Sequence, residues 1–358
     1  MEAIESGINT FDLLLRERII SDLRDGYPFS EVLITLSENL LLRGDYNGAR
    51  RLLNILLMRD LSSEGKFLEG RIHKMLGDIE FTQGNLDRAG EEYLLSKQLL
   101  GEYPAALNRI YLDLGNIAMQ KGEWSEMEKY YDLAEAGIQD GENDGFLADI
   151  EINRGISHSI RGDDAEALRR FERAMALISN DDQGRLASCF LDMSISQMEL
   201  GDLKESMESI RKALGYAKAI GDIDLETTIY INRVKLSLLL CDYMVAQFYA
   251  EKAFELAERV KNDFSKAEIL KLFGVIADKE GDREGAIAKL DEAVALSKKT
   301  GNASTLVESL IELGTIYLDD GDADRAVKII DEAKKKAEEH HLMKYIDRIS
   351  NLSKKSKR

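Results

Sequence analysis

The chain has 358 residues, with 66 acidic against 48 basic side chains and a formal net charge of −18. This balance argues against nucleic-acid binding, because phosphate contacts need clustered positive charge. With 2 prolines and 44% apolar residues, we expect an almost wholly helical, folded chain. No apolar run approaches the ~18 residues of a membrane span, so no membrane insertion is expected. The 2 cysteines and the non-basic first residues favour a cytoplasmic location.

Residues 1–29 precede a repetitive region and contain one amphipathic stretch, from about Phe11 to Leu23. The outermost units of a repeat array need a polar outer side. We therefore expect this stretch to form an N-terminal capping helix.

Residues 30–336 carry a turn signal that recurs about every 40 residues. Each signal is one residue, usually Gly, followed by Asp, Asn or Glu. The first residues of the eight signals are Gly44, Gly84, Gly122, Gly162, Gly201, Cys241, Gly281 and Gly321. A Gly can end a helix in the left-handed conformation, and a following Asp or Asn can cap the next helix. The regular interval predicts a tandem array of eight units.

Each signal has companions at fixed offsets. A small residue usually stands seven positions earlier, as at Gly155, and alanine five positions later, as at Ala167. A large residue stands nine positions later, as at Phe171, although Val234 and Ala250 depart from the pattern. Apolar residues between the signals follow the helical period. We therefore expect each unit to be an antiparallel helix pair in which a small residue faces a large one.

This pattern resembles the tetratricopeptide repeat, with its small residue in the first helix (A), its Gly turn and its Ala and aromatic positions in the second (B). The period is nearer 40 than the family's usual 34, and the proline that often closes each repeat is absent. This long subtype is similar to kinesin light chains, bacterial peptide-pheromone sensors and the sensor domain of the maltose regulator. The resemblance implies an all-α, right-handed α-solenoid of about eight helix pairs. The surplus length is expected in polar links between helix B and the next helix A, such as 179–184 and 300–302.

The end of the chain predicts a closing element. Residues 337–352 are expected to hold a C-terminal capping helix, from His341 to Leu352, with Ile346 and Ile349 on its apolar face. Residues 353–358 form a basic tail, which we interpret as a solubilising end; a tether to an anionic partner is the alternative.

No motif for phosphate binding, metalloprotease chemistry or a serine nucleophile occurs in the sequence. His73 and His158 are expected to pack or lie at the surface rather than bind metal. No nucleophile stands beside a base in the pattern. We therefore expect a non-catalytic protein without cofactor or metal, and disfavour an enzyme or a phosphatase-like regulator.

In the family that the pattern resembles, the A helices line the concave groove that binds peptides. Two positions before the small residue of helix A, four successive repeats carry Asp or Asn, where related repeats hold a peptide backbone with asparagines. An ionised Asp only accepts hydrogen bonds, so Asp would favour N–H groups or basic side chains of a ligand. The resemblance implies a groove lined by Leu112, Asp113, Asn116, Ile152, Asn153, Ile156, Leu191, Asp192, Ile195, Ile231 and Asn232. Asn153 and Asn232 are expected to be reachable by solvent. Alternatively, long helices curl the array tightly and bury part of this surface.

The sequence thus favours a protein- or peptide-binding scaffold that uses this groove. The alternative is a sensor or oligomerisation module that regulates a transcription factor or an ATPase in trans. The expected partner is a protein or peptide segment, and a homo-oligomer is also compatible with the sequence.

Overall fold

The computed structural model describes residues 28–42, 45–58, 65–138, 144–340, 342 and 345–356. All seventeen elements of this described part are α-helices, which confirms the all-α prediction. They fall into two compact units, residues 1–143 and 144–358, and each unit is described by itself. The predicted capping helix at Phe11–Leu23 lies outside the described residues.

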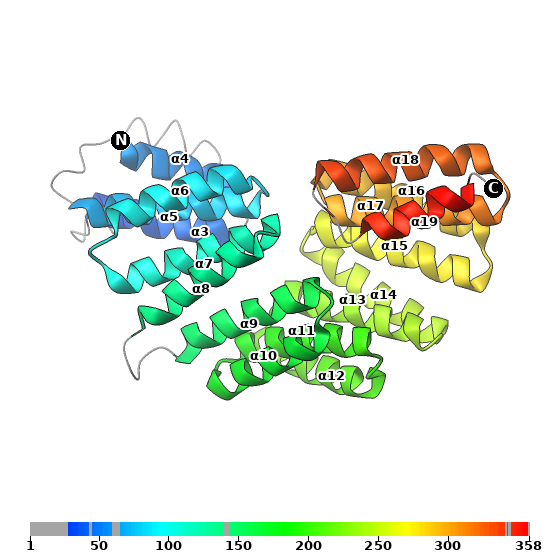
Figure 1. Cartoon of the computed structure of the whole chain (residues 1–358), viewed down its shortest axis with the longest axis horizontal. Helices are drawn as coiled ribbons and strands as arrows, with labels where there is room; N and C mark the ends of the chain where they lie inside the picture. Colours follow the sequence, from blue (N-terminus) through cyan, green and yellow to red (C-terminus); the bar gives the residue numbers. More distant parts are fainter. Residues whose placement is uncertain are drawn as a thin grey trace. The chain divides into compact units, whose positions relative to one another are not determined.

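The described residues of unit 1 form three helix pairs, whose helices are labelled in Figure 1. In chain order they are α3 (Phe29–Leu42) with α4 (Tyr46–Leu57), α5 (Gly65–Thr82) with α6 (Leu86–Leu99), and α7 (Pro104–Lys121) with α8 (Trp124–Ala136).

Unit 2 contains five pairs and a final single helix. The pairs are α9 (Asp144–Ile160) with α10 (Asp164–Leu177), α11 (Gln183–Leu200) with α12 (Leu203–Ile220), α13 (Ile223–Leu239) with α14 (Tyr243–Arg259), α15 (Asp263–Glu280) with α16 (Arg283–Thr300), and α17 (Ala303–Asp319) with α18 (Ala323–Glu339). The single helix is α19 (Ile346–Ser356).

The eight predicted pairs are therefore present, and the first helix of each is called its A helix and the second its B helix. Each A helix of unit 2 after α9 packs against the preceding B helix and also against the preceding A helix. The closing helix α19 packs in the same way on α18 and α17. It begins later than the expected His341 and continues through Lys354 and Lys355 of the predicted tail. The arrangement is that of a tetratricopeptide solenoid.

At the turns that the structure describes, the left-handed conformation is as predicted, whereas the predicted capping is found only in some repeats. Gly162 has φ 77° and Gly201 has φ 83°, both in the left-handed region that ends a helix. Cys241 replaces the glycine and still adopts φ 56°. The following residue caps the next helix in some repeats: Asp242 accepts from the Val245 N–H, whereas Asp202 makes no such bond. Capping was therefore predicted too generally.

Small residues of the A helices lie against large residues of the B helices, as the offsets predicted. A Cβ at Gly155 would lie 2.5 Å from the ring of Phe171, and one at Gly77 would lie 2.5 Å from the ring of Tyr93. These distances are shorter than any van der Waals contact. The two helices can therefore approach this closely only because glycine has no side chain. This observation confirms the register on which the prediction rested.

The two departures from the pattern compensate one another. Val234 occupies the small position of α13, and Ala250 occupies the large position of α14. Both are fully buried and belong to the same apolar cluster. In this pair the A helix therefore carries the larger side chain and the B helix the smaller one, so the volume between the helices is kept.

We expect Ala250→Leu to overpack this pair and to lower the free energy of unfolding by about 1–3 kcal/mol. Adding Val234→Gly should recover part of that loss, because the double variant restores the arrangement of the neighbouring repeats. Urea denaturation of the two single variants and the double variant measures the coupling. Strictly additive losses would show that the two side chains do not share one space.

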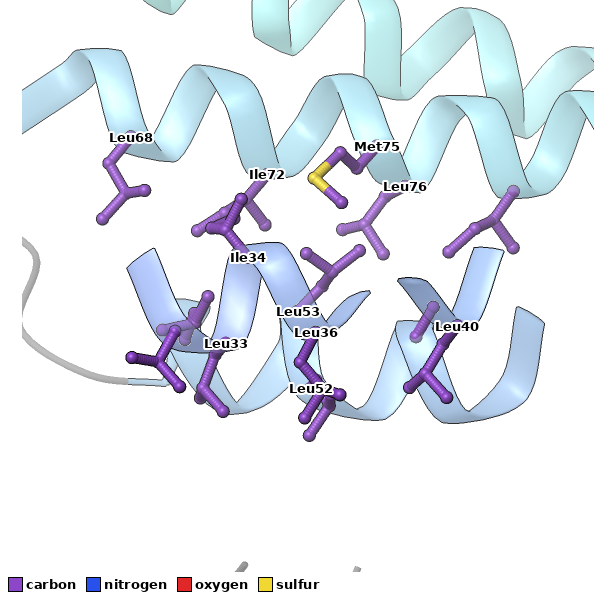
Figure 2. Packing of buried hydrophobic residues seen from close by; sticks show 14 residues of the cluster. Leu33, Ile34, Leu36, Leu40, Leu52, Leu53, Leu68, Ile72, Met75 and Leu76 are labelled. Carbon is purple, nitrogen blue, oxygen red and sulfur yellow. The ribbon is translucent and has the colours of Figure 1, made fainter. Parts of the chain in front are cut away.

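The core of unit 1 begins between its first two pairs. Leu33, Ile34 and Leu53 of the first pair and Ile72 of α5 are all fully buried (Figure 2). Their apolar side chains converge from α3, α4 and α5, so neither helix of the first pair buries its face alone. This dependence between neighbours is expected of stacked repeats.

The surplus length of the repeat lies partly in the helices. The B helices α12 and α16 have 18 residues each. Only Gly221 and Asp222 separate α12 from α13, and Gly301 and Asn302 separate α16 from α17. The expectation of a polar link at 300–302 is thus wrong for Thr300, which ends α16. The link expected at 179–184 is confirmed for 179–182 only, because Gln183 and Gly184 already belong to α11.

Candidate functional site

The predicted groove residues all lie on A helices, in two sets. Ile152, Asn153 and Ile156 lie on α9, Leu191, Asp192 and Ile195 on α11, and Ile231 and Asn232 on α13. Helix α11 contacts both α9 and α13, so this set forms one surface of unit 2, here called the A-helix face. Leu112, Asp113 and Asn116 lie on α7 of unit 1 and are described separately.

The apolar residues of the set differ in what they offer a ligand. Leu191 is 7% exposed, Ile231 2% and Leu112 3%, so all three belong to the core. Ile152, Ile156 and Ile195 are half-buried. The A-helix face therefore presents isoleucines of α9 and α11, whereas the predicted leucines mainly hold the helices together.

Two of the predicted asparagines, Asn232 and Asn116, make hydrogen bonds within the protein. Asn232 is 4% exposed and donates to the Thr228 carbonyl oxygen at 3.0 Å, so the expectation that solvent reaches it is wrong. The reason is that the amide bonds one turn back along its own helix. Asn116 accepts a hydrogen bond from the Tyr131 hydroxyl at 2.8 Å. Asn153 is half-buried.

In unit 1, Asp113 faces a cation on the preceding A helix. Its carboxylate lies 3.5 Å from the Lys74 ammonium, which also bonds Asp78 at 2.8 Å. Burial raises the pKa of Asp113 to about 6, and Lys74 only partly opposes this effect. Asp113 thus belongs to a buried cluster with Lys74, Asp78 and Tyr93, whose hydroxyl donates to Asp78.

In unit 2, Asp192 occupies the same repeat position as Asp113 but has no such cation. The residue that corresponds to Lys74 on the preceding A helix is Ile152. No hydrogen bond or ion pair joins the Asp192 side chain to another described residue. Burial alone raises its pKa to about 7. An uncompensated, half-buried carboxylate therefore lies among the isoleucines of the A-helix face.

Ion pairs link most neighbouring A helices of unit 2, and the sequence analysis did not find them. Arg185 of α11 pairs with Asp149 of α9 at 2.7 Å. Lys235 of α13 pairs with Glu268 of α15 at 2.7 Å. Two further pairs, Lys271 with Glu308 and Arg348 with Glu312, join α15 to α17 and α17 to α19. In the sequence, these ion pairs correspond to residues of opposite charge that recur 33 to 37 positions apart. Recognising them requires knowing how successive A helices stack.

Unit 1 holds a pocket of about 290 Å³ between the A helices α3, α5 and α7. Basic and acidic side chains surround an apolar floor. Arg71, Lys74, Arg109, Glu38 and Asp78 supply the charges, and Met75, Leu100 and Ile110 are among the apolar residues. Lys74 of α5 and Arg109 of α7 thus line the same pocket. The acidic groups already bind the basic ones, as Lys74 binds Asp78, so the pocket is close to neutral.

In the described part, no group of His, Cys, Asp and Glu is arranged to hold a metal ion. His73 pairs with Glu92 and His158 with Asp163. Burial, with a smaller effect of Asp192, raises the pKa of the Cys189 thiol to about 12. Within the same residues, no helix has the length and apolar character of a membrane span.

No family model and no curated protein matches the sequence. Solved structures do match its fold. The apo form of the quorum sensor NprR from B. thuringiensis has a TM-score of 0.69 and 14% identity, covering 94% of this chain and 96% of that one. A Rap protein complexed with Competence and Sporulation Factor has a TM-score of 0.62 and 13% identity, covering 80% and 85%. Aspartyl phosphate phosphatase F from Bacillus subtilis has a TM-score of 0.58 and 16% identity, covering 92% of each chain.

The chain is therefore a tetratricopeptide-like, all-helical repeat protein. It is structurally similar to Rap and NprR. At these identities the similarity concerns the fold, which is typical of protein- and peptide-binding modules.

Proposed function

We propose that this protein is a non-catalytic scaffold that binds a protein or peptide segment along the A-helix face of unit 2. The observation that carries the proposal is Asp192, a half-buried carboxylate that no other described residue pairs with, on the same face as Ile152, Ile156 and Ile195. Burying a charge without compensation costs stability, and such sites are typical of functional surfaces. The Rap protein complexed with Competence and Sporulation Factor supports binding by this fold.

The side chains of the A-helix face indicate which kind of ligand it would bind. Isoleucine side chains would receive apolar groups, and Asp192 would receive a lysine, an arginine or another cationic donor. An extended or helical segment would meet both along α9, α11 and α13.

The test uses a displayed library of random 12-residue peptides selected on the full chain. Enriched sequences should carry Lys or Arg next to apolar residues. A charge-assisted hydrogen bond contributes about 1.5–3 kcal/mol, so Asp192→Asn should weaken the best peptide roughly 10- to 100-fold in calorimetry. Asp331→Asn, at an exposed position of α18, is the matched control and should leave affinity unchanged. Equal affinity for both variants would move the site off Asp192.

The sensor alternative uses the same face and differs in its response. The match to the quorum sensor NprR, which covers 94% of this chain and 96% of that one, supports it. Light scattering with and without the enriched peptide separates the two functions. A scaffold keeps its oligomeric state, whereas a sensor or oligomerisation module changes it or changes its affinity for a partner in trans.

A further inference from the structure

Arginine occupies a packing position in two of the eight A helices. The position lies eight residues before the first residue of each turn signal, and in the other six repeats its side chain belongs to the apolar core or packs against it. The two exceptions are Arg154 of α9 and Arg233 of α13. A charge at such a position needs a counter-ion, because burying an unpaired charge is costly. The six apolar residues are Leu36, Leu76, Leu114, Met193, Phe273 and Leu313.

The fold provides that counter-ion for Arg154. Arg154 is 6% exposed and pairs at 3.3 Å with Glu151, one turn earlier on α9. Glu151 also pairs with Arg170 of α10 at 3.2 Å. The charge of Arg154 is thus compensated within its own helix pair.

Arg233 has aromatic neighbours in place of this counter-ion. Tyr230 stands in the repeat position of Glu151, and Tyr249 stands in that of Arg170. The guanidinium of Arg233 lies 5.3 Å from the centre of the Tyr249 ring. No carboxylate of the described residues pairs with Arg233, and its buried Nη1 has no hydrogen-bond partner there. Arg233 is therefore a half-buried cation that lacks an anion.

Aromatic rings continue from Tyr249 on two sides. Tyr249 stacks with Tyr230 at 5.7 Å and meets Phe248 edge-on at 5.2 Å. Lys218 of α12 lies over the Tyr230 ring, and Lys252 of α14 lies over the Phe248 ring. Three cations and three rings from α12, α13 and α14 thus form one group, here called the Arg233 cluster: Lys218, Tyr230, Arg233, Phe248, Tyr249 and Lys252.

The neighbouring carboxylates are engaged with other groups. Glu226 lies 3.7 Å from Lys218, and Glu255 lies 3.5 Å from Lys252. Glu251 accepts a hydrogen bond from Gln247 at 2.8 Å. Both lysines of the cluster therefore have an acidic neighbour, whereas Arg233 has none among the described residues.

We propose that the Arg233 cluster binds an acidic segment of a partner protein, with a Glu or Asp carboxylate on Arg233 and an adjacent apolar side chain on Phe248. Guanidinium and carboxylate match in geometry and charge. Phe248 is 53% exposed and Met244, one turn earlier on α14, is 81% exposed, so apolar surface adjoins the cation. The net charge of −18 opposes a second copy of this chain as the occupant.

This site differs from the proposed A-helix face in both place and chemistry. It uses the B helices α12 and α14 together with α13. It selects an anionic segment, whereas Asp192 is proposed to select a cationic one. One chain would thus hold two segments of opposite charge.

Fluorescence anisotropy of the full chain tests the proposal with a labelled, capped peptide that carries two Glu-Phe pairs among Gly and Ser. Its charge-free counterpart carries Gln in place of Glu. The wild type should bind the Glu peptide about 10- to 100-fold more tightly than the Gln peptide. Arg233→Leu should bind both equally weakly. Asp192→Asn should keep the preference, as should Arg169→Leu on α10, where the arginine side chain is 62% exposed.

Stability separates binding from a structural role. Leu stands at this position in four other repeats, so Arg233→Leu should fold and melt no lower than the wild type. Equal affinity of the wild type for both peptides, or an unchanged preference in Arg233→Leu, would overturn the proposal.

A further measurement needs no variant to fold. Hydrogen–deuterium exchange of the wild type with the Glu peptide at saturation should show protection in 243–259. Protection confined to helices other than α12, α13 and α14 would contradict the site. Sedimentation identifies the occupant: dimerisation of the wild type that Arg233→Leu abolishes would overturn the assignment to a partner protein.

Discussion

Replacing Lys271 by Met should destabilise unit 2 by about 3 kcal/mol, because it leaves the half-buried Glu308 carboxylate without its cation. Lys271 is only 6% exposed and pairs with Glu308, which also accepts from the Tyr345 hydroxyl. Burial pushes the pKa of Glu308 up, but Lys271 and Tyr345 outweigh it and bring the pKa to about 2. Without the Lys271 ammonium, the effect of burial on the pKa of Glu308 would dominate. Guanidinium denaturation measures the loss.

The control for this prediction is Lys334→Met on α18. Lys334 lies 3.8 Å from Glu338, and both side chains are more than half exposed. An exposed pair of this kind contributes about 0–1 kcal/mol. If the two variants lose the same stability, the chain of contacts from α15 through α17 to Tyr345 does not hold the end of unit 2 together.

Gly155→Leu should lower the free energy of unfolding by about 3 kcal/mol or more, since overpacking costs 1–3 kcal/mol when neighbours can adjust. Here the first added atom already meets the ring of Phe171 at 2.5 Å, and that ring is 1% exposed. The ring has no free space to enter, so the helices must separate. A thermal melt followed by circular dichroism measures the effect.

The matched control is Gly215→Leu, which introduces the same side chain into the middle of α12. A Cβ at Gly215 meets nothing within 4 Å, and the residue is exposed. Because leucine favours helix over glycine by several tenths of a kcal/mol or more, this variant should be neutral or slightly more stable. A melting temperature for Gly155→Leu as high as that of Gly215→Leu would show that the helix pairs are not in contact at this position.

The features that recur from repeat to repeat could be predicted from the sequence. The contact of Gly155 with Phe171, the left-handed turn at Gly201 and the pairing of the helices recur at fixed offsets, so each copy supports the others. The compensation of Val234 by Ala250 could have been found by comparing the two exceptions, which share one helix pair.

What the sequence did not predict depends on contacts between repeats. Asp113 and Asp192 occupy the same position in their repeats. The preceding A helix offers Lys74 to Asp113, whereas the equivalent residue before Asp192 is Ile152. Only the stacking of A helices shows that difference. Asn232 is likewise buried, and its amide already donates to the Thr228 carbonyl oxygen.

The central claim, that ligand binds the A-helix face of unit 2, is tested most directly by hydrogen–deuterium exchange with the enriched library peptide bound at saturation. The account predicts protection in α9, α11 and α13, with little change in the B helices α10, α12 and α14. Helix α14 exposes Met244 and Phe248 and is a competing apolar surface of unit 2. Protection confined to α12 and α14 would contradict the account.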